Sequence, residues 1–410
     1  MSKNNIAGKL SQFEKLIFLQ SEKTNRKKIT HPAKYNILTS KLNGELVSSS
    51  GGTYCLVKET FPFSHKLGNY QVDSEFLNRE IFFPHSLKKN MSKTKIEPDE
   101  LLFIDTETTG LGGSGSTAFL VGIGSISKQG FEIRQYFLPD YSDESFMLEA
   151  IREEISSNKI LVSYNGASFD IPLLNSRLII NRLGKSFKYA RHIDLLVHSR
   201  RIFKRRLKNC KLTNIEQELF QFYRTDDIPG YLVPYVYFEW LNNFSLKQMN
   251  RVLLHNRLDI LSLFYLFENL HQIYSSAGKN LSSLDDLHCL SKHFDRIGEF
   301  KNSEQIKKRI FGNSHSTLPN DILLYHSLAS KKSGNLSRAT NIWENLSASG
   351  KSKESYLALI ELAKYWEHKQ KDFAAALKYA RKAKSMAPFS TTSEMDLNKR
   401  IFRLNKRLKY

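Results

Sequence analysis

The residues whose types and spacing first suggest chemistry are two acids at the end of an apolar run. Asp105 and Glu107 close the stretch LLFIDTETTGL, which begins at Leu101. Because residues two apart on a strand project from the same face, we expect the two carboxylates to lie side by side. Two like charges at that separation repel each other unless a cation lies between them. The pair therefore indicates either a divalent-metal site or a solvated strand end.

Two further acids favour the metal site. Asp170 follows the short apolar run ILVSYN and precedes a helical segment, within YNGASFDIP, and Asp259 has apolar neighbours in HNRLDILSL. Alone, either acid is more typical of a helix cap or a salt bridge. Together with Asp105 and Glu107 they make four carboxylates on three elements, and such oxygen-rich ligand sets suit Mg²⁺ or Mn²⁺.

The motifs that carry these acids resemble those of a known superfamily and follow one another in its order. DTETTGL, NGASFD and HNRLD are similar to the three exonuclease motifs of the DEDD superfamily, which has a ribonuclease-H-like fold. The glycine-rich GLGGSGSTAFLVGIG, the HNRLDILSL ending and the helical tail resemble the YprB family in particular. The resemblance is greatest over residues 101–270. It implies that Asp105, Glu107, Asp170 and Asp259 hold two divalent ions, Mg²⁺ or Mn²⁺, for the hydrolysis of a phosphodiester.

His255 is the candidate for handling the proton of the attacking water. It precedes Asp259 by four positions, so on a helix the two residues share a face. In the DEDD superfamily this role belongs to a His five residues, or a Tyr four residues, before the last Asp; this chain has His at the Tyr spacing. The resemblance implies that His255 is a general base, since a histidine of ordinary pKa accepts protons near neutral pH. The alternative is a histidine that only packs on the helix.

Residues that flank the motifs are weaker candidates. Asp194, in HIDLL, is expected to support the metal site or to cap the next helix. The turn GLGGSGS is expected to be a tight hairpin and not a phosphate-binding loop, because no GK[ST] follows it. The candidate contacts to the terminal nucleotide are Thr106, Thr108, Gly110, Asn165 and Phe169.

The charge of the whole chain favours a polyanionic partner. Sixty-one Lys and Arg stand against 41 Asp and Glu among 410 residues, a formal net charge of +20. Nucleic acid is a better match for this excess than an anionic membrane, although basic proteins without such a partner also exist. The segment SRRIFKRRLKNCK concentrates the charge around Phe203, and we interpret it as a track that grips phosphates. Its candidate contacts are Arg200, Arg201, Lys204 and Arg205.

The elements that must bring the acids together have the pattern of an α/β domain. From about residue 100, apolar runs and helical spacing indicate three antiparallel strands, then helix, strand, helix, strand and helices. That order predicts a ribonuclease-H-like mixed sheet flanked by helices, over residues 97–275. Residues 1–96 have no clear fold, apart from a possible strand at 53–61.

Beyond residue 275 the strand signals stop and helical pairs recur. Gly298, Gly334 and Lys371 fall at matching turns, with steps of 36 and 37 residues. Helix, short turn and a second helix with small residues resemble tetratricopeptide units, so residues 280–410 are predicted to form a helical-repeat domain that recruits a protein. A plain helical bundle is the alternative.

These features predict a metal-dependent nuclease, specifically a 3′–5′ exonuclease acting on single-stranded ends of DNA or RNA. The alternative is a non-catalytic adaptor, although a protein that only binds nucleic acid gains nothing from a repulsive cluster of acids. A structure-specific endonuclease would differ from the exonuclease in its products. The three separated cysteines form no CxxC pair, and no apolar run approaches the length of a membrane span, so a reduced cytoplasmic protein is expected.

Overall fold

The structure is a computed structural model, and it divides into two compact units. The first unit contains the described parts of residues 1–83, 93–200 and 209–272. The second contains those of residues 84–92, 201–208 and 273–410. The residues that the structure describes are 31–72, 75–76, 81, 83–84, 96–110, 115–312, 318–386 and 391–409.

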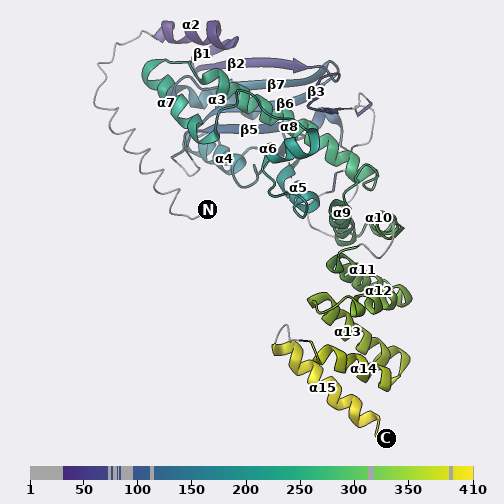
Figure 1. The fold of residues 1–410 in the computed structure, drawn as a ribbon. Coiled ribbons are helices and arrows are strands. Elements are labelled where there is room, and N and C mark those ends of the chain that lie inside the picture. Colours follow the sequence, from purple (N-terminus) through teal and green to yellow (C-terminus); the bar gives the residue numbers. More distant parts are fainter. Residues whose placement is uncertain are drawn as a thin grey trace. The chain divides into compact units, whose positions relative to one another are not determined.

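A seven-stranded mixed sheet forms the centre of the first unit (Figure 1). Its strand order is β1-β2-β7-β6-β5-β8-β9, with antiparallel pairs from β1 to β5 and parallel pairs from β5 to β9. The strands are β1 (Glu45–Ser49), β2 (Gly52–Phe61), β5 (Leu101–Thr108), β6 (Ala118–Ser127), β7 (Gly130–Phe137), β8 (Ile160–Ser163) and β9 (Arg191–Asp194); β3 (Lys66–Leu67) and β4 (Tyr70–Gln71) form a separate pair. The predicted mixed sheet with its antiparallel start is confirmed.

The N-terminal region completes this sheet. Strand β2 pairs with β7 from Cys55, opposite Phe137, to Phe61, opposite Phe131, and β1 adds the edge strand. The predicted strand at 53–61 is thus part of the central sheet. Residues 1–30 lie outside the described residues, as do 111–114 of the predicted GLGGSGS hairpin, although the flanking strands β5 and β6 do pair antiparallel.

Helices cover the sheet through aromatic contacts. Phe264 of α8 stacks on Phe131 with 4.3 Å between ring centres, and Tyr237 of α7 stacks on Phe119 at 4.2 Å. The helices of this unit are α2 (His31–Leu42), α3 (Glu144–Glu154), α4 (Asp170–Ile180), α5 (Leu195–Phe203), α6 (Leu212–Ile215), α7 (Val233–Asn243) and α8 (Met249–Ser275), with short helical turns η2 (Pro98–Glu100), η3 (Tyr141–Asp143), η4 (Glu216–Phe220) and η5 (Gly230–Leu232); α5 and α8 each continue into the second unit.

The second unit is a run of helical pairs. Gly298, Gly334 and Lys371 all have left-handed backbone conformations, with φ of 86°, 87° and 60°, so each ends a helix as predicted. The assignment of these pairs as tetratricopeptide repeats remains a prediction. The helices are α9 (Leu284–Ile297), α10 (Phe300–Gly312), α11 (Asn320–Lys332), α12 (Leu336–Ala348), α13 (Lys353–Tyr365), η7 (Trp366–Gln370), α14 (Phe373–Lys384) and α15 (Thr391–Arg407).

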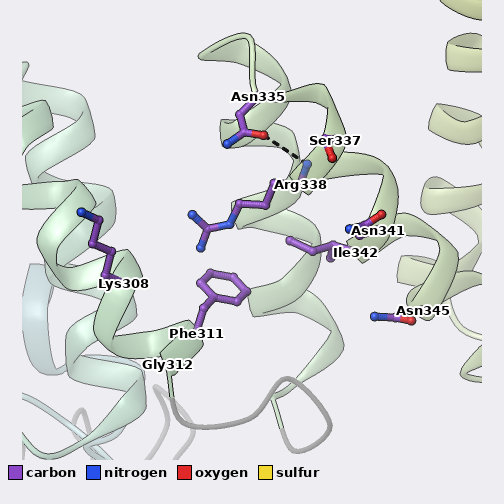
Figure 2. A pocket seen from close by; sticks show the side chains of 9 residues that line it. All are labelled: Lys308, Phe311, Gly312, Asn335, Ser337, Arg338, Asn341, Ile342 and Asn345. Atoms are coloured by element: carbon purple, nitrogen blue, oxygen red, sulfur yellow. Dashed lines mark hydrogen bonds between the residues drawn. The ribbon is translucent and has the colours of Figure 1, made fainter.

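A pocket of about 640 Å³ lies at α10 and α12 of this unit (Figure 2). Its lining combines two cationic side chains, Lys308 and Arg338, with the amides of Asn335, Asn341 and Asn345. The guanidinium of Arg338 lies 4.4 Å from the ring centre of a phenylalanine that also lines the pocket. The pocket therefore presents positive charge on an ordered aromatic support.

Three buried histidines make the second unit sensitive to acid. His288 contacts His326 through Nδ1 and Nε2, 3.2 Å apart, and neither they nor His293 is more than 3% exposed. Burial, with neighbouring cations, lowers the pKa of His288 to about 4 and of His293 and His326 to about 3. The folded unit thus keeps these rings neutral where the unfolded chain, with a pKa near 6.5, is protonated.

We therefore expect the second unit to lose stability as the pH falls from about 6.5 towards 4. Each histidine contributes up to about 1.4 kcal/mol per pH unit, because the unfolded state takes up the proton first. Amide hydrogen exchange in α9 and α11, measured at pH 7 and pH 5, tests this. Replacement of His326 by Asn should reduce the pH dependence, whereas equal protection at both pH values in the unsubstituted chain would contradict the account.

Among the described residues, no helix has the length and apolarity needed to cross a bilayer.

Candidate metal centre and active site

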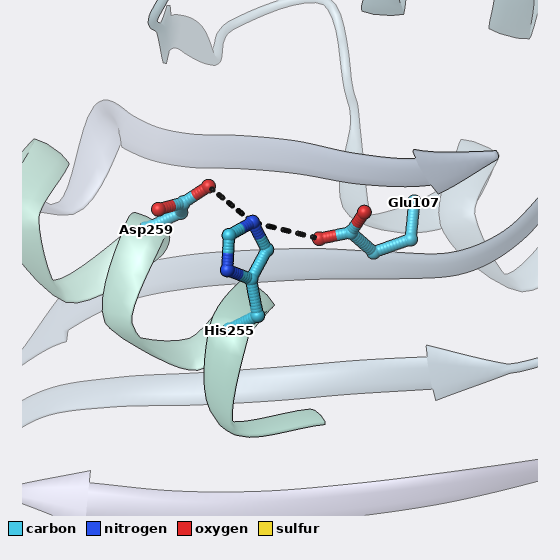
Figure 3. A group of neighbouring side chains, drawn as sticks. All are labelled: Glu107, His255 and Asp259. Atoms are coloured by element: carbon cyan, nitrogen blue, oxygen red, sulfur yellow. Dashed lines mark ion pairs between the residues drawn. The ribbon is translucent and has the colours of Figure 1, made fainter. Parts of the chain in front are cut away.

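Acids from three elements meet at the carboxyl end of β5. The first four residues of β5 are buried, and the strand becomes partly exposed at Asp105, where the acids begin. Ligand atoms of Glu107, Asp259 and His255 lie within 4.8 Å of one another (Figure 3). Asp170, the first residue of α4, is close enough to raise the pKa of Asp105, as are Glu107 and Asp259. The structure thus brings together the four acids that the sequence motifs single out.

The electrostatics of this cluster call for a cation. Burial, and then the carboxylates of Asp259, Glu107 and Asp170, raise the pKa of Asp105 well above its ordinary value. Burial also raises the pKa of Glu107 to about 8 and that of Asp170 to about 6. Without a metal, the raised pKa values of Asp105 and Glu107 favour protonated carboxyls near neutral pH, and a divalent cation would take the place of those protons. Because the four donors are carboxylate oxygens, the residues fit a hard cation such as Mg²⁺ or Mn²⁺.

The loop before α4 is shaped to present Asp170. The side chain of Asp194 accepts hydrogen bonds from the backbone N–H groups of Asn165 at 2.8 Å and Ala167 at 3.3 Å. Asp194 also accepts from the N–H of Leu196 at the start of α5, as expected of a cap, while its predicted support of the metal site stays a prediction. A Cβ atom at Gly166 would lie 2.4 Å from a neighbouring serine hydroxyl and 3.0 Å from Asp170 Oδ2, so the close approach requires glycine.

The buried amide of Asn256 holds Asp105, although the sequence motifs do not mark this asparagine as a site residue. Asn256, fully buried, donates from Nδ2 to Asp105 Oδ2 at 2.9 Å, and its Oδ1 accepts from Gln135 Nε2 at 2.9 Å. Gly122 stands in register between Asp105 on β5 and Gln135 on β7. A Cβ atom there would lie 2.3 Å from Asn256 Oδ1. Gly122, the first glycine of GIG, therefore makes room for the Asn256 amide, which bonds to Asp105 on β5 and to Gln135 on β7.

A second group of residues that the sequence motifs do not identify surrounds His255. Asp227 Oδ1 lies 2.6 Å from His255 Nδ1, and Arg224 pairs with Asp259, Asp227 and Glu216. Burial lowers the pKa of His255, but the hydrogen bond to Asp227 and the nearby carboxylates outweigh it and raise that pKa to about 9. The only sequence signal for this group is the charged run YRTDD, which is also typical of a solvated loop.

The residues predicted to contact the substrate differ in their exposure and in the hydrogen bonds that they form. Thr106 donates its hydroxyl proton to Asp170 Oδ1 at 2.5 Å, and Thr108 donates to the carbonyl of Gly110 at 2.6 Å. Both hydroxyls thus serve the local structure of the site. Phe169 is 42% exposed beside Asp170, and Asn165 has a left-handed φ of 68°.

The predicted basic track is divided between the two units. Arg200 belongs to the first unit, whereas Arg201, Lys204 and Arg205 belong to the second. Arg200 and Lys204 are exposed, but Arg205 forms ion pairs with Asp285 and Asp321. Arg205 is thus engaged by acids that follow it by 80 and 116 residues, an arrangement that the basic run itself does not reveal.

Comparison with known proteins agrees with this fold. Residues 102–271 match the RNase_H_2 family of the RNase_H superfamily, so the first unit has the ribonuclease-H-like nuclease fold. The uncharacterized protein YprB of Bacillus subtilis (strain 168) is 33% identical over 363 residues, which cover 86% of each chain. The chain therefore belongs to the YprB family, as its motifs predicted.

Among solved structures, a match is found to the family B DNA polymerase from the hyperthermophilic archaeon Pyrobaculum calidifontis. The two chains are 16% identical and superpose with a TM-score of 0.33. The match covers 66% of this chain and 36% of the polymerase.

Proposed function

We propose that this chain is a metal-dependent nuclease, specifically a 3′–5′ exonuclease that hydrolyses single-stranded DNA or RNA from its ends. The observation that carries the proposal is the convergence of Asp105, Glu107, Asp170 and Asp259, because carboxylates this close together repel one another unless a cation lies among them. Such a cluster is costly for a protein that only binds polyanions, because it repels them. A bound metal turns the same cluster into a site that attracts phosphate.

Each residue of the site has a separate role in this proposal. The four carboxylates supply oxygen ligands for two ions, Mg²⁺ or Mn²⁺. When bound, such ions lower the pKa of a water and neutralise the leaving oxygen of the phosphodiester. Bound cations would offset the carboxylate charges that raise the pKa of His255. With that charge offset, His255, whose Nε2 lies among these carboxylates, accepts the proton of the attacking water.

The substrate contacts are assigned to residues that flank the acids in the first unit and to the basic segment. We assign Thr106, Thr108 and Gly110 to the shape of the pocket for the terminal nucleotide, and Asn165 to its sugar or base. The exposed ring of Phe169 offers a stacking surface next to a metal ligand. Arg200 and Lys204 are exposed members of the basic segment and are candidates to contact phosphates. Arg201 is only partly exposed and Arg205 is engaged by Asp285 and Asp321, so both are weaker candidates.

The test is a digestion of oligonucleotides that carry separate labels at the two ends, with Mg²⁺ or Mn²⁺ present. We expect immediate release of a labelled mononucleotide from the 3′ end, a ladder of shortened products that keep the 5′ label, and no cleavage in EDTA. Comparison of DNA with RNA, and of single strands with duplexes, identifies the substrate. Internal cuts would select an endonuclease instead, and the absence of any product would contradict the proposal.

The second candidate function is a nucleic-acid-binding adaptor whose helical unit recruits a protein. Binding without cleavage, unaffected by EDTA, would favour it. The cationic pocket at α10 and α12 offers counter-charges for an acidic group of such a partner. Replacement of Arg338 by Ala should then weaken capture of that partner while nucleic-acid binding by the first unit is unchanged.

A further inference from the structure

The two ring nitrogens of His255 face different surroundings. Nε2 lies 3.9 Å from Glu107 Oε1 and 3.7 Å from Asp259 Oδ2, between two of the proposed metal ligands (Figure 3). Nδ1 lies 2.6 Å from Asp227 Oδ1, a carboxylate outside that set. Because a carboxylate only accepts hydrogen bonds, this contact places a proton on Nδ1. In the neutral ring the lone pair is then on Nε2, which faces the acids.

Asp227 is itself held on both its side chain and its backbone. Its Oδ1 accepts the N–H of Ile228 at 2.8 Å, and its Oδ2 lies 3.3 Å from Arg224 Nη1. Arg251 donates to the backbone carbonyls of Asp226 and Asp227 at 2.9 and 2.7 Å. The carboxylate therefore has little freedom to leave His255.

Arg224 ties the same segment to the proposed metal ligands. Its side chain is 5% exposed, and it pairs with the fully buried Glu216 as well as with Asp259. One guanidinium thus joins Asp227, which contacts the histidine, to Asp259, which faces it. The segment from Arg224 to Asp227 thus fixes His255 and Asp259, from which its contacting residues lie 28 and 35 positions away in the chain.

From this geometry we propose that Asp227 is a positioning residue for the reaction, which fixes the tautomer and direction of His255 so that Nε2 takes the proton of the attacking water. The inference rests on the proposed nuclease function. In the step itself, the water oxygen forms the new bond to phosphorus as its proton moves to Nε2, and the bond to the leaving oxygen breaks. Asp227 stays ionised and stabilises the imidazolium, as a carboxylate beside a general-base histidine does.

The test compares Asp227→Asn and Asp227→Ala with Asp226→Asn. Asp226 is the neighbouring acid, its side chain is exposed, and its left-handed φ of 56° is one that asparagine tolerates. We expect kcat to fall on the order of 10- to 100-fold in Asp227→Ala. A general base contributes a rate factor of about 10²–10⁴, and a histidine ring that is no longer held in the right orientation loses part of that factor. The asparagine variant should retain more activity, since its amide oxygen still accepts the Nδ1 proton. KM and Mn²⁺ affinity should stay within about twofold, and Asp226→Asn should match the unsubstituted protein.

A double-mutant cycle separates positioning from a merely structural role. If Asp227 acts through His255, then Asp227→Asn causes no further loss of kcat in a His255→Gln background. Additive losses would overturn the inference while leaving the nuclease function intact. If the protein cleaves no substrate, the proposed nuclease function is itself contradicted.

A readout that does not depend on activity is the ¹⁵N spectrum of the histidine ring in protein loaded with Mg²⁺. We expect a protonated Nδ1 for His255 in the unsubstituted chain and its loss in Asp227→Ala. The same ring state in both proteins would overturn the inference even if no activity is found.

Discussion

Asp105→Asn is expected to reduce kcat/KM by about a thousandfold or more while leaving the fold intact. Several kcal/mol of transition-state stabilisation depend on bound metal, and about 1.4 kcal/mol corresponds to a factor of ten. Asparagine has nearly the shape of aspartate, and its side-chain oxygen still accepts the hydrogen bond that Asn256 donates. The substitution thus removes the ligand charge and little else. The measurement is steady-state cleavage of an end-labelled oligonucleotide in Mg²⁺ or Mn²⁺.

Thermal melting distinguishes this effect from unfolding. Because the folded state raises the pKa of Asp105 and Glu107, their protonated forms favour folding. For Glu107 that stability is lost as the pH rises from about 4.5 through about 8, and for Asp105 it is lost as the pH rises above the ordinary pKa of an aspartate. The metal-free variant should therefore melt at or above the temperature of the unsubstituted protein at pH 8, and lose the stabilisation that Mg²⁺ confers. Asp99→Asn, an exposed acid just before β5, is the matched control. Retention of more than a tenth of the activity by Asp105→Asn would contradict the assignment.

Gly122→Ala is expected to lower kcat about 10- to 100-fold, although Gly122 contacts no substrate. Its new methyl carbon would lie 2.3 Å from Asn256 Oδ1, on a central strand that cannot shift. The amide must then move and lose its hydrogen bonds to Gln135 and Asp105. Loss of such hydrogen bonds to a metal ligand typically lowers activity or metal affinity about 10- to 100-fold. Overpacking should also cost about 1–3 kcal/mol of stability.

Gly124→Ala provides the matched control for this prediction. It lies two residues further along the same strand, and its Cβ atom would press on the apolar side chains of Phe131 and Ile260, at 2.4 and 2.8 Å. We expect a similar loss of stability with near-normal kcat. Asn256→Ala should reproduce the catalytic defect of Gly122→Ala. Equal kcat values for the two glycine variants would show that the amide bridge does not position Asp105.

The parts of the site that sequence could predict are those set by local spacing. Strand alternation placed Asp105 and Glu107 together, and motif order brought in Asp170 and Asp259. The turns at Gly298 and Gly334 followed from the repeat in the helical tail. In each case the signal lies within a few residues of the chain, where backbone geometry dictates side-chain direction.

The supporting residues depend on contacts that local spacing does not encode. Asp227 reaches His255 across 28 residues, and Asn256 reaches Asp105 across 151. Arg205 was predicted to grip phosphate, but acids of the helical unit engage it. From a single sequence, a charged or polar residue is expected to be solvated, because a partner that is distant in the chain becomes known only from the fold.

The most direct test of the central claim is an anomalous difference map from a crystal soaked in Mn²⁺ with a short oligonucleotide bound. The account predicts two Mn²⁺ peaks among Asp105, Glu107, Asp170 and Asp259, with the 3′-terminal phosphodiester beside them. Peaks elsewhere, or no peak at these four acids, would contradict it.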